Sequence, residues 1–280
     1  MAVALKRGLG LLKVGVLSRI GWGLLAALSL APAAMADMVL HADPVPVSVD
    51  TIRQWGQRTQ EQGWRRYECA PLAEFPGAVL CLFAHSMMMN DIFHGAATAI
   101  EAPRGMAGSR SAALLGIDFR IDDLVAYRER RYPEGNVAPP DEAETPATRE
   151  RVFLFEALPQ LRERLGARSV IAAAWGNLPT IAHELYHARY FSDAAYRAAV
   201  IAFWNERLSD RERDHVRAVL APLYDSRNED LVINEFQAYV LPATAGPWVR
   251  DLNQKYRVSL REYLRERGFA PLPPLEGAAG

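Results

Sequence analysis

The chain has 280 residues and a formal net charge of −1, and 50% of its residues are hydrophobic. This length accommodates one large domain or two small ones, and so apolar a composition excludes a globally disordered protein. A nucleic-acid partner is not expected, because Lys255 is the only lysine beyond residue 36 and the arginines there are interleaved with acids instead of forming a basic stripe.

The first 36 residues are typical of a secretory signal peptide. A basic start leads into an apolar run that is interrupted by Pro32 and ends in the small-x-small triplet Ala34-Met35-Ala36. We predict cleavage after Ala36 and a periplasmic or secreted protein with no stable membrane span. Cleavage would remove four basic residues and leave a net charge of about −5. The alternative is an uncleaved anchor, for which the apolar run is short.

Cys69 and Cys81 are the only cysteines. An even pair in an exported chain predicts a disulfide, which would close a loop of about 13 residues and contribute roughly 3 kcal/mol of stability. Two buried free thiols are the alternative. A metal site at this pair is not expected, because its spacing is not C-x-x-C.

Residues 37–133 are predicted to form an N-terminal α+β part. Its expected elements are a helix over 48–67 capped by Ser48 or Asp50, strands over 77–85 and 114–121, and a helix over 122–132. Residues 134–149 combine proline, glycine and acidic residues, and this composition predicts a flexible loop.

Residues 150–280 are predicted to be mainly helical and to form one catalytic domain together with the N-terminal part. A helical pattern around 149–166 is bent or interrupted by Pro159 and closed by Gly166, and a buried strand is expected over 168–175. The later helices are expected over 192–208, over 210–224 after a Ser209–Glu212 capping box, over 227–241 after a Ser226–Glu229 box, and over 251–267, with Pro242 and Gly268 as stops.

The stretch NLPTIAHELYHARYF, residues 177–191, contains the pattern H-E-x-x-H. Residues four apart share one face of a helix, so His183 and His187 project together and can hold one zinc ion. Glu184 lies beside His183 and can reach a water next to the ion without being a ligand. This arrangement is a zinc hydrolase signature. The competing interpretation is an amphipathic helix with polar residues at its buried edge, but two histidines at metal spacing favour the site.

A catalytic zinc usually has three protein ligands, and the third must come from elsewhere in the chain. Asn234-Glu235, in the stretch VINEFQAYVL, together with the H-E-x-x-H pattern resembles the gluzincin type of zinc metallopeptidase. The resemblance covers about residues 175–241. It implies a predominantly helical zincin-like α+β domain, a small sheet before the motif helix, one zinc per chain, and Glu235 as the third ligand.

Tyr239 is a departure from this resemblance, because thermolysin-like and neprilysin-like helices carry an aspartate there that orients a zinc-bound histidine. Three roles are open for Tyr239: accepting a hydrogen bond from an imidazole, donating one to the substrate oxyanion, or packing only. We name Tyr239 as a candidate catalytic residue. The carboxylate that orients each histidine is not assigned by the sequence.

Other residues compete for the same roles. Asp193 lies where metzincins carry a third histidine, but the glycine turn of those families is missing. Glu229 and Asp230 fall in a first helical turn, where acids are expected in any case. The remaining histidines near the middle of the chain are His85, His94 and His215, and either of the first two is able to enter the cleft. The methionines at 87–89 predict core packing or an apolar wall.

The strand expected over 168–175 has two interpretations. In zincins an edge strand above the metal pairs with an extended substrate, and residues 173–177 stand in the right order for that role. A buried core strand is the equally supported alternative.

These residues predict an exported zinc metallopeptidase. Zinc held by His183, His187 and Glu235 would polarise the substrate carbonyl, while Glu184 takes a proton from the attacking water and delivers it to the leaving nitrogen. The alternatives are an amidohydrolase acting on cell-wall or other non-protein amides, and a non-catalytic exported metal-binding protein. The expected partner is a peptide or protein substrate, whose identity the sequence does not give.

Overall fold

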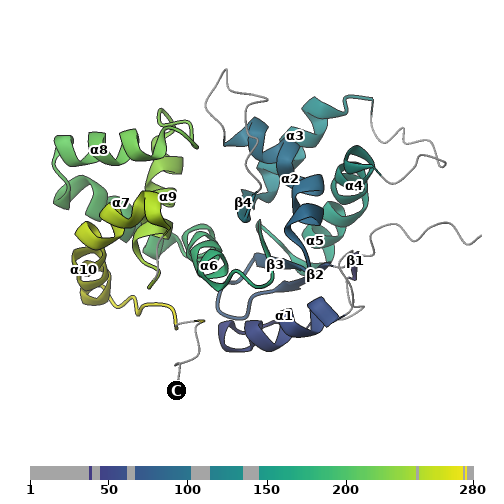
Figure 1. Ribbon diagram of the computed structural model, residues 1–280, viewed down its shortest axis with the longest axis horizontal. Coiled ribbons are helices and arrows are strands. Elements are labelled where there is room, and N and C mark those ends of the chain that lie inside the picture. The colour runs from purple at the N-terminus through teal and green to yellow at the C-terminus, as the bar shows by residue number, and fades with distance from the viewer. Residues whose placement is uncertain are drawn as a thin grey trace, which may run out of the picture. The chain divides into compact units, whose positions relative to one another are not determined.

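The computed structural model describes residues 38–39, 45–61, 67–101, 114–134, 145–243, 246–273 and 275 (Figure 1). The predicted signal peptide, its cleavage site after Ala36 and most of the predicted loop 134–149 lie outside these residues. The fold is α+β, with most residues in helices and one small mixed sheet, in agreement with the predicted class. No helix in the described residues has both the length and the apolar character that crossing a membrane requires.

The sheet has the strand order β1-β2-β3-β5-β4. Its strands are β1 (Met38–Val39), β2 (Tyr67–Pro71), β3 (Ala78–Phe83), β4 (Gly116–Arg120) and β5 (Ser169–Ala174). β2 and β3 run antiparallel, β3 and β5 parallel, and β5 and β4 antiparallel. The three predicted strands are therefore present as β3, β4 and β5, and the sequence did not predict β1 and β2.

The helix predicted over 48–67 is shorter than expected. A 3₁₀ turn (Val49–Thr51) leads into α1 (Ile52–Glu61), and Tyr67 already belongs to β2. Ser48 stands at the N-cap position of that turn without a side-chain cap bond. Tyr67 leaves the helical pattern because its ring is buried and stacks on Phe83 at a centroid distance of 4.5 Å.

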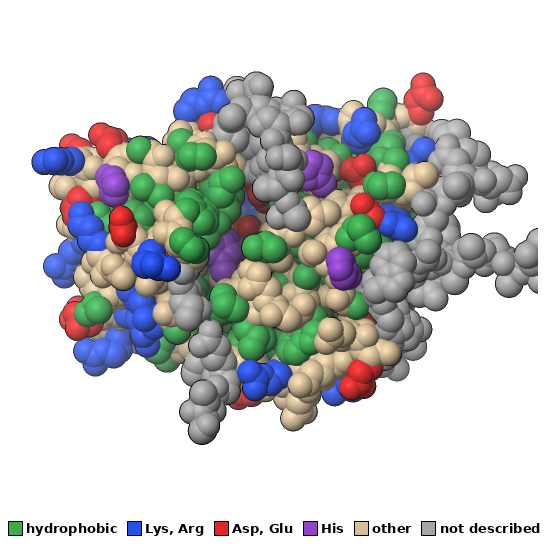
Figure 2. All heavy atoms as spheres, viewed as in Figure 1, with side chains coloured by type: hydrophobic (Ala, Val, Ile, Leu, Met, Phe, Trp, Pro, Cys, Tyr) green, Lys and Arg blue, Asp and Glu red, His purple; other side chains and the backbone are tan. Residues whose placement is uncertain are grey.

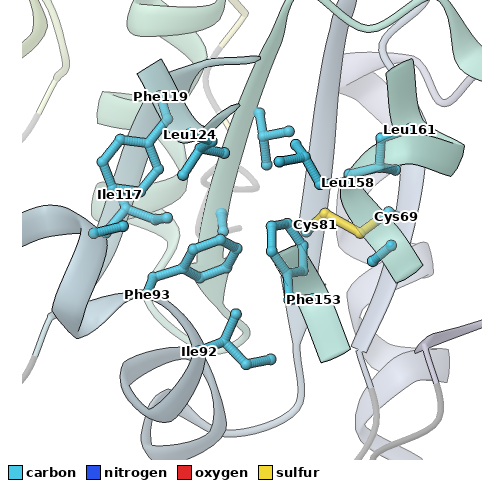
Figure 3. Close-up of a cluster of buried hydrophobic side chains, with 14 of the residues drawn as sticks. Cys69, Cys81, Ile92, Phe93, Ile117, Phe119, Leu124, Phe153, Leu158 and Leu161 are labelled. Atoms are coloured by element: carbon cyan, nitrogen blue, oxygen red, sulfur yellow. A yellow bond between two sulfur atoms is a disulfide. The ribbon is translucent and has the colours of Figure 1, made fainter. Parts of the chain in front are cut away.

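The predicted disulfide is confirmed. Cys69 and Cys81 lie directly opposite each other on β2 and β3 and are bonded. Both side chains are buried in the core on one face of the sheet (Figure 3). The bond therefore joins neighbouring strands inside the molecule.

Helices cover both faces of the sheet because β3 alternates its side chains between two cores. Val79, Cys81 and Phe83 face a core that is covered by α2 (Ser86–Ile100), α3 (Ile121–Arg131), α4 (Pro146–Val152), a π-helical turn (Phe153–Ala157) and α5 (Leu158–Leu165). Leu80 and Leu82 face a second core with α1 and α6 (Leu178–Ser192). Both faces of β3 are therefore dry, which explains its unbroken apolar sequence.

The helical segment around Pro159 is continuous, with a widened turn in place of a break. The amide of Leu158 bonds to the Phe153 carbonyl, one residue further back than in an α-helix. Proline at 159 has no N–H and crowds the preceding turn, so a π-helical turn relieves the conflict. Gly166 ends the segment with φ of 61°, a left-handed conformation that suits glycine.

The remaining helices, which follow α6 in the chain, pack with it around a third core. They are α7 (Ala194–Arg207), α8 (Asp210–Leu220), α9 (Glu229–Val240) and α10 (Arg250–Glu266), with a 3₁₀ turn over Pro247–Val249. The Ser209–Glu212 capping box is present. The predicted Ser226–Glu229 box is wrong, because Asn228 caps α9 by accepting from the Leu231 amide at 3.3 Å.

Candidate metal centre

The motif helix α6 begins where the sequence places it. The Asn177 side chain caps it by accepting from the Thr180 amide at 3.3 Å, and Pro179 occupies the first turn. Two turns along, His183 and His187 bring their Nε2 atoms to 2.9 Å from each other. The His187 side chain is fully buried, and that of His183 is 13% exposed.

Helix α9 brings the predicted third ligand to the same point. Glu235 Oε2 lies 3.7 Å from His183 Nε2, and Glu235 Oε1 lies 3.8 Å from His187 Nε2. The Glu235 side chain is only 1% exposed. The structure thus gathers His183, His187 and Glu235 into one group that can hold a metal ion.

The orientation of His183 depends on a backbone carbonyl. The imidazole of His183 donates to the carbonyl of Ala238. In a regular helix that carbonyl would accept from residue 242, but Pro242 has no N–H, so the acceptor is free for the histidine. Burial, and then the neighbouring His187 ring, lower the pKa of His183 well below its usual value and keep the ring neutral.

The orientation of His187 depends on Asp118, which the sequence analysis did not consider. Asp118 Oδ2 on β4 lies 3.5 Å from His187 Nδ1 and accepts a hydrogen bond from Asn234 Nδ2 at 3.1 Å. The asparagine of the Asn234-Glu235 pair therefore holds the carboxylate that faces the metal-site histidine. Burial raises the pKa of Asp118, while His187 and Asn234 act in the opposite direction.

One face of β4 borders this centre through Gly116 and Asp118. Gly116, Asp118 and Arg120 alternate with the core residues Ile117 and Phe119. A Cβ at Gly116 would lie 2.1 Å from Glu184 Oε1, so only glycine leaves room for that carboxylate. The strand GIDFR was recognisable as a strand, and this polar alternation is the signal that would have pointed to Asp118.

Glu184 lies beside the group of ligands and is 3% exposed. Its Oε2 atom is buried and has no hydrogen-bond partner among the described residues. Burial raises the pKa of Glu184 well above its usual value, and the nearby carboxylates of Asp118 and Glu235 raise it further. Such a group readily holds a proton and has an oxygen atom available to transfer it.

Tyr239 lies on the same side of the centre as His183, and their ring centroids are 4.2 Å apart. Its hydroxyl is 2.9 Å from that of Tyr224, which the sequence analysis did not single out. The role of accepting from an imidazole is wrong, because His183 donates to Ala238 and His187 faces Asp118. Burial raises the pKa of both phenols well above the usual value, so both remain donors.

The centre opens into a cleft of about 470 Å³. Its described lining includes His183 and Glu184 on one side, Leu115 and Gly116 at the end of β4, and the aromatic residues Tyr224, Tyr239 and Trp248. Figure 2 shows a hollow near the middle of one face, with a histidine side chain inside it and hydrophobic side chains around it. The cleft can therefore receive an apolar group next to the ligands.

The rival third ligands are engaged elsewhere. Asp193 caps α7 by accepting from the Tyr196 amide at 2.9 Å. Glu229 accepts from Trp204 and Arg217, and Asp230 accepts from Arg120, Arg197 and Tyr190. These carboxylates hold helices together and do not face His183 or His187.

The other histidines and the methionines lie outside the cleft lining in the described part of the chain. His85 caps α2 by accepting from the Met87 amide, and His215 is exposed on α8. Of the three methionines, Met88 and Met89 on α2 are fully buried in the core, as predicted, whereas Met87 is 52% exposed.

Of the two interpretations of the strand expected over 168–175, the structure supports the buried core strand. β5 pairs with β3 along one edge and with β4 along the other, so neither edge can receive a substrate. The edge strand next to β5 is β4, and its first residue lines the cleft.

The donor set fits a metal ion. The His183 ring donates to the Ala238 carbonyl, and the His187 Nδ1 atom faces the Asp118 carboxylate at 3.5 Å, so each ring can keep a lone pair for a cation. Two lone pairs and the Glu235 carboxylate then meet at one point, an arrangement that a cation stabilises. A second group, Asp118, Glu184 and His187, also lies within metal-binding reach. In this group, Asp118 also accepts from Asn234 and faces His187 Nδ1.

No protein-family model matches the chain, and no curated protein or solved structure is similar enough to count as a match. The gluzincin resemblance therefore stays a prediction. Function has to be inferred from the chemistry of the site.

Proposed function

We propose that this protein is an exported, zinc-dependent hydrolase that cleaves peptide bonds. The observation that carries the proposal is the convergence of His183, His187 and Glu235 on one point at the wall of the cleft, with the unpaired Glu184 carboxylate oxygen beside it. Three protein donors beside an open cleft are the arrangement of catalytic zinc sites, whereas structural sites are closed by four donors.

Zinc is favoured by the kind and spacing of the donors. Two imidazoles and one carboxylate are a known zinc set, and donors about 2.0–2.1 Å from a tetrahedral ion lie roughly 3.3 Å from one another. The observed separations of 2.9, 3.7 and 3.8 Å bracket that spacing. The outer contacts to Ala238 and Asp118 supply the orientation that histidine ligands usually have.

Each residue of the centre has a separate role in the proposed hydrolysis. A bound zinc ion supplies the Lewis acidity that polarises the scissile carbonyl. Glu184 Oε2 accepts the proton of the attacking water and then delivers it to the leaving nitrogen. The Tyr239 hydroxyl accepts from Tyr224, keeps its own proton and is placed to donate it to a substrate oxygen in the cleft.

A peptide substrate is favoured by β4. This strand lies at the edge of the sheet, and Leu114, Leu115 and Gly116 at its start line the cleft. An extended peptide can add to such an edge through backbone hydrogen bonds, which a substrate without a regular backbone cannot do. The role that the sequence analysis considered for β5 is thereby transferred to β4.

Export is supported by the Cys69–Cys81 disulfide, since such bonds persist in oxidising compartments. The proposal includes the predicted removal of residues 1–36 and a periplasmic or secreted location. N-terminal sequencing of the mature protein checks it, and a retained N-terminus contradicts cleavage.

The test of the proposed function is the substitution Glu184→Gln. Glutamine keeps the size of the side chain but cannot accept the proton, so hydrolysis should fall on the order of a hundredfold or more. Zinc content and melting temperature should stay near wild type, because Glu184 is not a ligand. The assay uses a mixed peptide library and a cell-wall digest in parallel, with Glu163→Gln on the exposed surface of α5 as the matched control.

Cleavage at defined library bonds that is lost with a chelator and with Glu184→Gln supports the peptidase. Activity confined to the cell-wall digest supports the amidohydrolase instead. A Glu184→Gln protein as active as wild type would falsify the catalytic role of the motif, and binding of zinc without turnover on either substrate supports a metal-binding protein.

A further inference from the structure

A second cavity lies beside the cleft and has no part in the proposed chemistry. Its volume is about 220 Å³, and its walls come from α6, the end of α9, α10, residues 271–273 and Leu275. Pro179 and Pro242 line both cavities, so the second cavity adjoins the cleft across the first turn of α6. We refer to it as the arginine pocket, after Arg257 and Arg261.

The walls of the arginine pocket combine apolar surface with positive charge. The described lining is mainly leucine, proline and alanine, and its only charged side chains are those of Arg257 and Arg261 on α10. The hydroxyl of Tyr186 also lines it and accepts from the Leu272 amide, which leaves the phenol proton available to donate. The described lining of the pocket contains no acidic residue.

Neither guanidinium group has a carboxylate partner in the described part of the chain, in contrast to three arginines on α7 and α8. Arg197, Arg213 and Arg217 each bond to an acid. Arg257 reaches only the Ala243 carbonyl, at 3.4 Å, and its buried Nε has no hydrogen-bond partner among the described residues. Arg261 follows four residues later on the same face of α10, where two like charges repel.

We propose that the arginine pocket binds a carboxylate attached to an apolar group. The planar guanidinium fork matches a carboxylate in two parallel hydrogen bonds, and the Arg257 Nε is one of the donors that such a bond needs. The leucine and proline walls accept the apolar part. A neutral apolar ligand would leave two like charges unpaired, and a bare inorganic anion would leave the apolar walls wet.

Two sources can supply this chemistry. One is the C-terminal carboxylate of a peptide whose remaining residues lie in the adjoining cleft. The other is a free small acid that occupies the pocket alone. Because the two cavities share Pro179 and Pro242, a single chain is able to reach from one to the other.

The test is calorimetric titration of the full chain with N-acetyl-leucine and with N-acetyl-leucinamide, which differ only in the terminal group, a carboxylate in the first and a neutral amide in the second. The acid should bind, and the amide should bind at least about tenfold more weakly, as expected for losing a charged hydrogen bond. Arg257→Gln and Arg261→Gln should each weaken the binding of N-acetyl-leucine by a similar factor. Arg250→Gln, at an exposed position of the same helix, should leave the affinity for N-acetyl-leucine unchanged.

Equal binding of acid and amide, no binding of either, or unchanged binding in both pocket variants overturns the proposal. His183→Ala is the control against coordination at the metal, because the acid should bind this variant as it binds wild type. The titration needs no turnover, so its failure is distinguishable from failure of the proposed hydrolase activity.

A competition experiment with Glu184→Gln identifies the source. A peptide ending in Ala-Leu with a free carboxylate should displace N-acetyl-leucine more strongly than its C-terminal amide if the peptide's own end fills the pocket. If both peptides bind without displacing the acid, a free small acid is the ligand. Either result supports a carboxylate pocket, provided that Arg257→Gln weakens binding of the acid.

Discussion

The two sides of the metal centre are built from different kinds of core. On the sheet side, the two cores of the described residues up to 175 consist mainly of aliphatic residues and phenylalanines, with few bonded aromatic polar groups such as Trp55, and one of them contains the disulfide. On the helical side, the core of α7 to α10 is richer in tyrosine, and several of its aromatic polar atoms bond to side chains, such as Trp204 to Glu229 at 2.7 Å and Tyr196 to Gln237 at 2.9 Å. Helix α6 lies between them and contacts both (Figure 1).

The difference follows from where the backbone hydrogen bonds go. Central strands bond to each other, so their side chains need no polar atoms and the core can be dry. Helices satisfy their own backbones but must be joined to one another, and amphipathic aromatic residues with a bonded polar end do this. The acids Glu229 and Asp230 are used for this purpose, which leaves Glu235 as the α9 carboxylate that faces the histidines.

The largest expected effect comes from removing the ligand that the helical side contributes. Glu235→Ala should weaken zinc binding by at least about a hundredfold, since zinc sites with about four ligands gain roughly 10–16 kcal/mol in total. Competition with a coloured chelator measures the affinity. Asp193→Ala is the matched control at the end of α6, and a variant at Glu235 with wild-type affinity contradicts the proposed ligand set.

The sheet side contributes the outer carboxylate, and its loss should cost less. Asp118→Asn keeps the shape of the side chain but removes the charge facing His187, so zinc affinity should fall by about 10–100-fold. The same chelator competition measures this effect, with Asp122→Asn on the exposed face of α3 as control. An effect as large as that of Glu235→Ala would make Asp118 a ligand and shift the site toward the Asp118, Glu184 and His187 group.

Removing the disulfide tests the sheet side by itself. A Cys69→Ala, Cys81→Ala double variant should lose roughly 3 kcal/mol of unfolding free energy, because the cross-link restricts the unfolded chain. Denaturant unfolding in oxidising buffer measures this loss, and wild type in reductant serves as the comparison. Zinc affinity should be unchanged, and a parallel loss of zinc would show that the sheet core also positions the ligands.

The smallest effect is expected at the contact between the two sides. Asp230 bonds to Arg120 on β4 at 2.7 Å, to Arg197 on α7 at 2.6 Å and to Tyr190 on α6 at 2.9 Å. These side chains are partly exposed, so Asp230→Asn should cost about 1–2 kcal/mol, measured by denaturant unfolding. Asp214→Asn removes an exposed ion pair with Arg217 within α8 and should cost less than 1 kcal/mol of unfolding free energy. Equal losses would mean that Asp230 does not join the two sides.

The sequence by itself determined the local features of this protein. The spacing of His183 and His187 fixed their common face on α6, because helical geometry depends only on residues four apart. Asn177, Ser209, Gly166 and Gly268 marked helix ends for equally local reasons, and the alternation of apolar residues indicated three of the strands. The Cys69–Cys81 pair followed from the cysteine count.

Only the tertiary structure decided which residues distant in the chain contact these local features. Asp118 is 65 residues or more from every other member of the centre, and its role depends on β4 being the edge strand next to α6. Ala238 orients His183 because a proline four residues later frees its carbonyl, which becomes relevant only when α9 packs against α6. The arginine pocket likewise exists because α10 and the C-terminal segment meet α6. Such contacts join residues that are distant in the chain, and no local pattern specifies them.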